Sequence, residues 1–127
     1  MIILDTHIWI WWVTNSTLLK KKFRYLIEKE DVAINVISCW EVAKSVEKNK
    51  IQFNISVDQW LKEAIEDYSI TIIPLDIAII VESTRLPGKF HKDPADQLIV
   101  ASARVYDIQL LTADEKILKY PFVKLLK

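Results

Sequence analysis

Short apolar runs alternate with segments of helical periodicity along most of this chain. The runs at residues 1–4, 32–36, 70–75 and 109–112 have the length and composition of buried strands. Parallel strands need a crossover between them, usually a helix, so this alternation predicts an α/β fold. We expect a three-layer α/β/α sandwich with a central, mostly parallel sheet of four to five strands. The run at 122–126 is the candidate fifth strand.

Helices are predicted between and after these strands, where apolar residues recur every three or four positions. Polar residues stand at most of the predicted starts, and such residues commonly cap helices. Thr6, Ser38, Asp76, Asp93 and Asp114 are the expected caps. The expected helical segments are 6–13, 17–29, 39–46, 57–68, 77–81, 93–106 and a short turn after 114.

Four acidic residues fall where a strand should give way to a helix. They are Asp5, Glu41, Asp96 and Asp114. The carboxyl ends of parallel strands share one edge of the sheet, where ligands of such folds bind, so we expect these side chains to meet there. Neighbouring carboxylates disfavour one another's ionised form. Their convergence therefore predicts a bound divalent cation.

The donor types restrict which cation this is. The chain has two histidines and one cysteine, far too few for a Cys/His zinc site. Carboxylate oxygens alone favour Mg²⁺ or Mn²⁺. Two such ions ~4 Å apart can activate water for in-line displacement at a phosphodiester. The formal net charge is zero, so a nucleic-acid substrate would have to be met by a local basic patch.

Each acid also has a purely structural explanation. Ser38 and Glu41 match a capping box, and Asp96 would suit the positive end of a helix dipole. Asp5 and Asp114 could each cap the helix that follows. Topology alone does not identify the site residues, because Asp76 too follows a strand and opens a helix. The shared placement of the four acids nevertheless favours a functional site.

The segments LDTHIWIWW, SCWEVAKS, HKDPADQLIVASA and LLTADEKI resemble the PIN-domain family, and specifically the VapC-type toxins of bacterial toxin–antitoxin pairs. The resemblance covers nearly the whole chain, so residues 1–127 are expected to form a single domain. It implies a metal-dependent endoribonuclease with a carboxylate-bound Mg²⁺ or Mn²⁺. It also implies a cognate antitoxin that blocks the site.

Carried over by motif, the family's acidic residues fall on Asp5, Glu41, Asp96 and Asp114. The first and third would be the principal metal ligands, and the other two would complete the shell or position water. Asp93 is interpreted mainly as a cap. Thr6 and Thr112 would orient carboxylates or water, and Gln97 stands where many similar toxins carry arginine.

Two alternatives remain open from the sequence. One is a PIN-type nuclease that acts in RNA processing without toxicity, and the other is a non-catalytic scaffold whose acids only cap helices. The expected partners are the RNA substrate, the antitoxin and a second copy of the chain. The start of the chain lacks the features of a signal peptide, and no apolar run approaches the ~20 residues of a membrane span, so a cytoplasmic protein is expected.

The sequence pattern also predicts roles for several other side chains. Trp9, Trp11 and Trp12 are expected in the core or at a dimer interface, with stacking on RNA the less favoured alternative, and Trp40 and Trp60 are expected to pack internally. Lysines 20–22 are expected to form a solvated helix face. The basic loop before Asp93 is either an RNA contact or an ordinary charged loop, and the sequence favours neither. Its His91 has no partner evident from the sequence. That loop carries Arg85, Lys89, His91 and Lys92.

Overall fold

A four-stranded, entirely parallel sheet forms the centre of the molecule in the computed structural model, which describes all 127 residues. The strand order is β3-β2-β1-β4, so the first strand lies inside the sheet between β2 and β4. The register pairs Ile3 with both Ala33 and Leu110. The strands are β1 (Ile2–Leu4), β2 (Val32–Asn35), β3 (Thr71–Ile73) and β4 (Gln109–Leu111).

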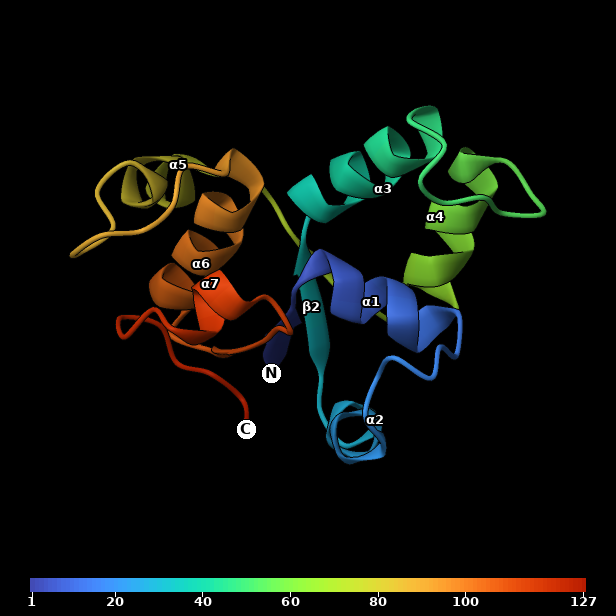
Figure 1. Cartoon of the computed structure of the whole chain (residues 1–127), viewed down its shortest axis with the longest axis horizontal. Coiled ribbons are helices and arrows are strands. Elements are labelled where there is room, and N and C mark those ends of the chain that lie inside the picture. The colour runs from blue at the N-terminus through green and yellow to red at the C-terminus, as the bar shows by residue number, and fades with distance from the viewer.

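Helices cover both faces of this sheet, which confirms the predicted three layers. The chain trace in Figure 1 places α5, α6 and α7 to one side of β2 and helices α1 to α4 to the other. The helices are α1 (Thr6–Val13), α2 (Lys21–Glu28), α3 (Ile37–Glu47), α4 (Val57–Glu66), α5 (Ile77–Ser83), α6 (Pro94–Tyr106) and α7 (Glu115–Leu118).

The strands are mostly apolar, and both faces of the inner strands β1 and β2 are buried. Ile2 and Leu4 of β1 pack into the core shared with α1. Ile3, between them, packs into a second core with α6 residues such as Ile99. This alternation follows the two-residue period of a strand. Both cores lie directly against the sheet and hold its carboxyl edge in place.

Two predicted strands differ from the observed ones. The 122–126 run adds no fifth strand and makes only an isolated parallel bridge, between Leu110 and Leu125. β3 is shorter than predicted and lies at the edge of the sheet, so Ile72 is 41% exposed. An apolar run therefore predicted a strand correctly but not its position at the sheet edge.

Two predicted caps are also wrong. α1 is capped by Asp5 rather than Thr6, because the Asp5 carboxylate accepts from the Thr6 N–H at 2.8 Å. α3 begins at Ile37, after an N-cap residue, Val36, that has no side-chain bond. The capping box between Ser38 and Glu41 is thus absent, and the Glu41 carboxylate is available for other contacts.

The tryptophans divide between core and surface. Trp9 is fully buried and donates to the Ala64 carbonyl at 3.4 Å, and Trp60 stacks on Phe53 with ring centroids 4.3 Å apart. The prediction that Trp40 packs internally is wrong, because this residue is 55% exposed. No helix in the structure has both the length and the apolar character needed to cross a membrane.

Candidate active site

Asp5 stands at the end of the inner strand β1 and is almost completely buried. Its Oδ1 accepts from the Thr6 N–H, and its Oδ2 accepts from the Thr112 hydroxyl at 2.6 Å. Thr112 follows β4, the neighbouring strand, so the parallel pairing of β1 with β4 brings the two side chains together. Burial raises the pKa of Asp5, although both hydrogen bonds oppose that shift.

Glu41 projects from α3 toward the same edge. Its Oε1 hydrogen-bonds to the Thr6 hydroxyl, which also contacts the hydroxyl of Ser38 at 2.8 Å. Burial, together with the nearby charges of Asp5 and Asp96, raises the pKa of Glu41 from 4.5 to about 7, against the opposing hydrogen bond from Thr6. Glu41 forms no ion pair with Lys44 on the helix surface, because Lys44 binds Glu47 at 2.8 Å.

Asp96 lies in the first turn of α6, and its side chain is turned away from the helix backbone. Capping is done by Asp93, which accepts from the Asp96 N–H at 3.0 Å. The Asp96 carboxylate instead contacts His91 Nε2 at 2.6 Å. Burial raises the pKa of Asp96, helped by the charge of Asp5, while the hydrogen bond from His91 lowers it.

Asp114 caps a helix and also lies beside the other acids. Its carboxylate caps α7 by accepting from the Lys116 and Ile117 N–H groups. Its own N–H donates to the Thr112 hydroxyl at 3.0 Å, which joins it to Asp5 through one threonine. Together with Asp96 it lines an open hollow of about 340 Å³ that no hydrophobic residue lines.

The structure therefore brings the four predicted acids to one edge of the sheet, where they form an acid cluster. Asp76 lies outside this cluster. That residue follows the outer strand β3, caps α5 and contacts Tyr106. Capping alone explains Asp76 and Asp93, but it explains neither Glu41 nor the carboxylate of Asp96.

The acid cluster has the chemistry of a site for a hard cation. Three of its carboxylates have raised pKa values, because they are withdrawn from water and lie near one another. All donors are oxygens, as Mg²⁺ and Mn²⁺ prefer. As the side chains stand, no three His, Cys, Asp or Glu residues form a complete metal cage. The contacts with Thr6, Thr112 and His91 hold the carboxylates in their present orientations.

Three supporting residues were missed or misread from sequence. His91 contacts Asp96, and the Gln97 side chain donates to the His91 carbonyl at 3.1 Å, which fixes the loop against α6. The buried Asn35 accepts from the Ile37 N–H and donates to Ser102 at 2.7 Å. It ties the start of α3 to α6, the helices that carry Glu41 and Asp96. The Asn35–Ser102 pair spans 67 positions, so no local pattern could reveal it.

Comparisons with known proteins identify the family of this chain. The family model described as "PIN domain" matches residues 2–123. Over 117 residues the chain is 31% identical to Ribonuclease VapC22 of Mycobacterium tuberculosis, covering 91% of this chain and 88% of that protein.

Solved structures share the fold at lower sequence identity. A toxin–antitoxin complex from Klebsiella pneumoniae matches with a TM-score of 0.70 and 21% identity, over 97% of this chain and 95% of that one. VapBC2 of Rickettsia felis, bound to a DNA fragment from its promoter, matches with a TM-score of 0.70 and 19% identity, over 99% and 98%. With the family match spanning nearly its whole length, the chain belongs to the PIN-domain family.

Proposed function

We propose that this protein is a metal-dependent endoribonuclease and the toxin of a toxin–antitoxin pair. One observation carries the proposal: in a PIN-domain chain, three carboxylates with raised pKa values stand at the carboxyl edge of the sheet. Burying three carboxylates near one another lowers the stability of the fold, and a bound cation would offset that cost. The similarity to a protein named a ribonuclease supports RNA as the substrate.

Asp5 and Asp96 would be the principal ligands of Mg²⁺ or Mn²⁺, with Glu41 and Asp114 completing the shell or positioning water. When bound, the ion supplies positive charge at the phosphodiester and lowers the pKa of a bound water. Thr112 and the Thr6 N–H hold the Asp5 carboxylate in one orientation. Thr6 does the same for Glu41, so the acids are arranged before substrate arrives.

The site would be inhibited by a cognate antitoxin. Structural relatives of this chain were solved as toxin–antitoxin complexes, which supports a protein partner of this kind. We further propose that residues 1–127 act as a single domain in the cytoplasm and that the toxin is a homodimer. The candidate dimer surface consists of exposed apolar residues of β3, of the segment that follows it and of α5: Ile72, Leu75, Ile77, Ile80 and Val81.

Cleavage assays on Asp96→Asn protein test the catalytic proposal. Asp76→Asn is the matched control, since Asp76 also follows a strand and precedes a helix but lies outside the acid cluster. With Mg²⁺ or Mn²⁺ we expect Asp96→Asn to lose RNA cleavage by at least about a hundredfold, as for an essential electrostatic group. Asp76→Asn should cleave normally. Wild-type rates from purified Asp96→Asn protein would refute the assignment.

Expression in a bacterial host tests the toxin proposal separately. Wild-type protein should arrest growth, and the Asp96→Asn variant should not. If the wild type cleaves RNA in vitro but is harmless at high expression, the protein is a PIN nuclease of RNA processing instead. The neighbouring gene product should rescue growth when it is produced together with the wild type.

A further inference from the structure

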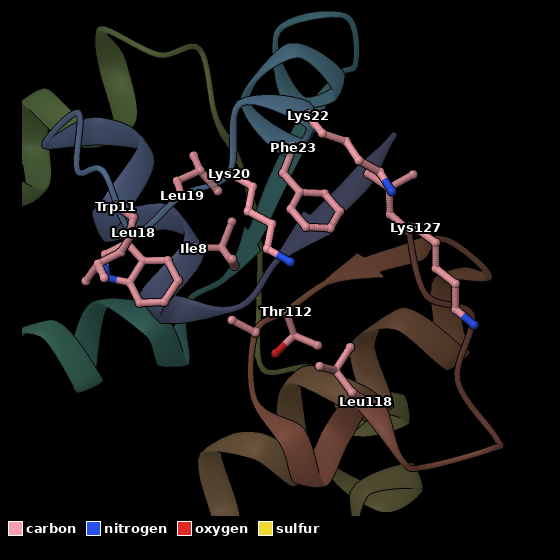
Figure 2. Close-up of a pocket in the computed structure, with 12 residues that line it drawn as sticks. Ile8, Trp11, Leu18, Leu19, Lys20, Lys22, Phe23, Thr112, Leu118 and Lys127 are labelled. Atoms are coloured by element: carbon pink, nitrogen blue, oxygen red, sulfur yellow. The ribbon is translucent and has the colours of Figure 1, made fainter.

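A second hollow, of about 350 Å³, lies beside the acid cluster. It is enclosed by α1, by the start of α2 and by the segment that leads from β4 into α7 (Figure 2). Eight of its twelve lining residues are hydrophobic, among them Ile8, Trp11 and Phe23. Its size is within the range of pockets that hold small ligands.

This hollow shares a wall with the proposed catalytic site. Thr112 lines it and also donates to the Asp5 carboxylate at 2.6 Å. Ala113 lines it too, and the next residue, Asp114, lines the acidic hollow. A strand of RNA whose phosphodiester lies over the acids therefore reaches this hollow at a neighbouring nucleotide.

The two hollows differ in charge. The acidic one is lined by four carboxylate residues, one histidine and one lysine. The second one contains Lys20, Lys22 and Lys127 and no acidic residue, and none of the three lysines forms an ion pair. Figure 2 shows the Lys20 side chain extending between Ile8 and Phe23 toward Thr112. Lys22 Nζ lies 5.4 Å from the centroid of the Phe23 ring, and none of the three lysines has a carboxylate partner. Their charges complement phosphates, which the neighbouring carboxylates repel.

The lining also offers flat apolar surface for a base. Trp11 and Phe23 are both partly buried, so their rings are held by packing but still reach solvent. Aromatic rings beside lysines are the usual combination for binding single-stranded nucleic acid. The sequence predicted lysines 20–22 as a uniform solvated face, but only Lys20 and Lys22 line the hollow, and Lys21 does not.

We propose that this hollow is a subsite for an unpaired nucleobase of the RNA, next to the scissile phosphodiester. The base packs against the apolar wall that includes Phe23, and the lysines bind the flanking phosphates. The proposal rests on the ribonuclease function and adds the place on the protein that holds the nucleotide beside the cut.

Binding measurements in EDTA test the subsite without cleavage. The probes are oligouridylate and oligoadenylate, each intact and with one base removed at successive positions. For the wild type, loss of the base at one position should weaken binding by about fivefold or more, in line with the energy of base–aromatic contact. Phe23→Leu, which keeps apolar volume but removes the ring, should bind the intact and abasic strands with similar affinity.

Adjacent lysines provide the matched control. Lys22→Ala should weaken binding of the intact strand, and Lys21→Ala should leave it unchanged, because both are exposed and only the first lines the hollow. Circular dichroism checks that each variant is folded. Equal responses of wild type and Phe23→Leu to base removal would overturn the proposal and leave the hollow to a protein partner. Since no metal is present, that failure would not touch the catalytic assignment, which Asp96→Asn tests.

Discussion

At the scale of single residues, burial disfavours the charged carboxylates of the acid cluster, and hydrogen bonds from neighbouring residues stabilise them. Asp5 is only 5% exposed, and Glu41 and Asp96 lie near it and near each other. Each carboxylate receives a hydrogen bond that partly offsets the cost of its charge: from Thr112, Thr6 and His91 respectively. The remaining cost makes the site sensitive to protons and cations.

Glu41→Gln should stabilise the metal-free protein at neutral pH. The folded-state pKa of Glu41 is about 7 against 4.5 when exposed, so the folded protein binds more protons than the unfolded chain between these values. Stability therefore falls as pH rises through that window. Glutamine removes the charge and with it the penalty, which we expect to be ~1–2 kcal/mol after allowing for solvent screening.

Urea unfolding in EDTA below and above this window measures the effect. The wild type should lose more stability than Glu41→Gln as the pH is raised from about 5 to about 8. If the stabilities of the two proteins changed equally with pH, burial would not disfavour the charged form of Glu41.

His91→Ala should raise the pKa of Asp96 further. The bond from His91 Nε2 favours the ionised carboxylate, and nothing replaces it in alanine. Divalent ions must then displace a proton from a larger fraction of molecules, so Mn²⁺ affinity near neutral pH should fall. Carbon-detected NMR titration of the Asp96 carboxyl in metal-free protein checks the first step, and an unchanged titration would show that the contact carries no such role.

At the scale of elements, helix caps and proposed metal ligands occupy the same helix starts. Asp5, Asp93 and Asp114 all cap helices through their carboxylates. The sequence could place these residues at helix starts because apolar periodicity marks where the helices begin. It could not separate the two roles, since the same residue types serve both. The distinction depends on where each strand lies in the sheet, as Asp76 beside the outer strand shows.

The unpredicted features share one property: they depend on partners distant in sequence. The Ser38–Glu41 spacing suggested a local capping box, but α3 starts before Ser38 and Glu41 turns to Thr6 instead. The 122–126 run had strand-like composition, yet backbone pairing with β4 is limited to one bridge. Local patterns thus predicted the layers, the parallel sheet and the positions of the acids, but not the contacts that orient them.

Paired substitutions separate the two roles of the helix-start acids. Asp93→Ala removes a cap from α6 and should cost about 1 kcal/mol of stability while RNA cleavage persists. Asp114→Asn retains a side chain able to cap α7 but loses its charge, so it should keep wild-type stability and lose cleavage. Urea unfolding and a cleavage assay on both proteins decide the matter. The reverse pattern would make Asp93 the functional residue.

At the scale of the whole molecule, α1 places its tryptophans in or against the core, whereas α5 exposes apolar side chains to solvent. Trp9 of α1 lies in the core, and the partly buried Trp11 and Trp12 pack against it, in agreement with the predicted core role. Three exposed apolar side chains lie on the short helix α5, and one of them, Ile77, is 81% exposed. A face of this kind beside an edge strand is typical of an association surface.

Ile77→Asp should therefore convert the proposed homodimer to a monomer without unfolding it, since this side chain is largely in solvent within one chain. Tyr25→Asp, at an exposed position on α2, is the control and should leave the assembly unchanged. Sedimentation velocity of both variants measures the outcome. A dimer that persists in Ile77→Asp would place the interface elsewhere.

The convergent carboxylates are tested most directly by calorimetric titration of Mn²⁺ into wild-type protein and into Asp5→Asn. Asparagine keeps the shape of a side chain bonded to Thr6 and Thr112 but removes the charge at the centre of the cluster. The wild type should bind Mn²⁺, and Asp5→Asn should bind it at least about tenfold more weakly while remaining folded. Equal Mn²⁺ binding by both proteins, or none by the wild type, would contradict the account and leave the acids as helix caps.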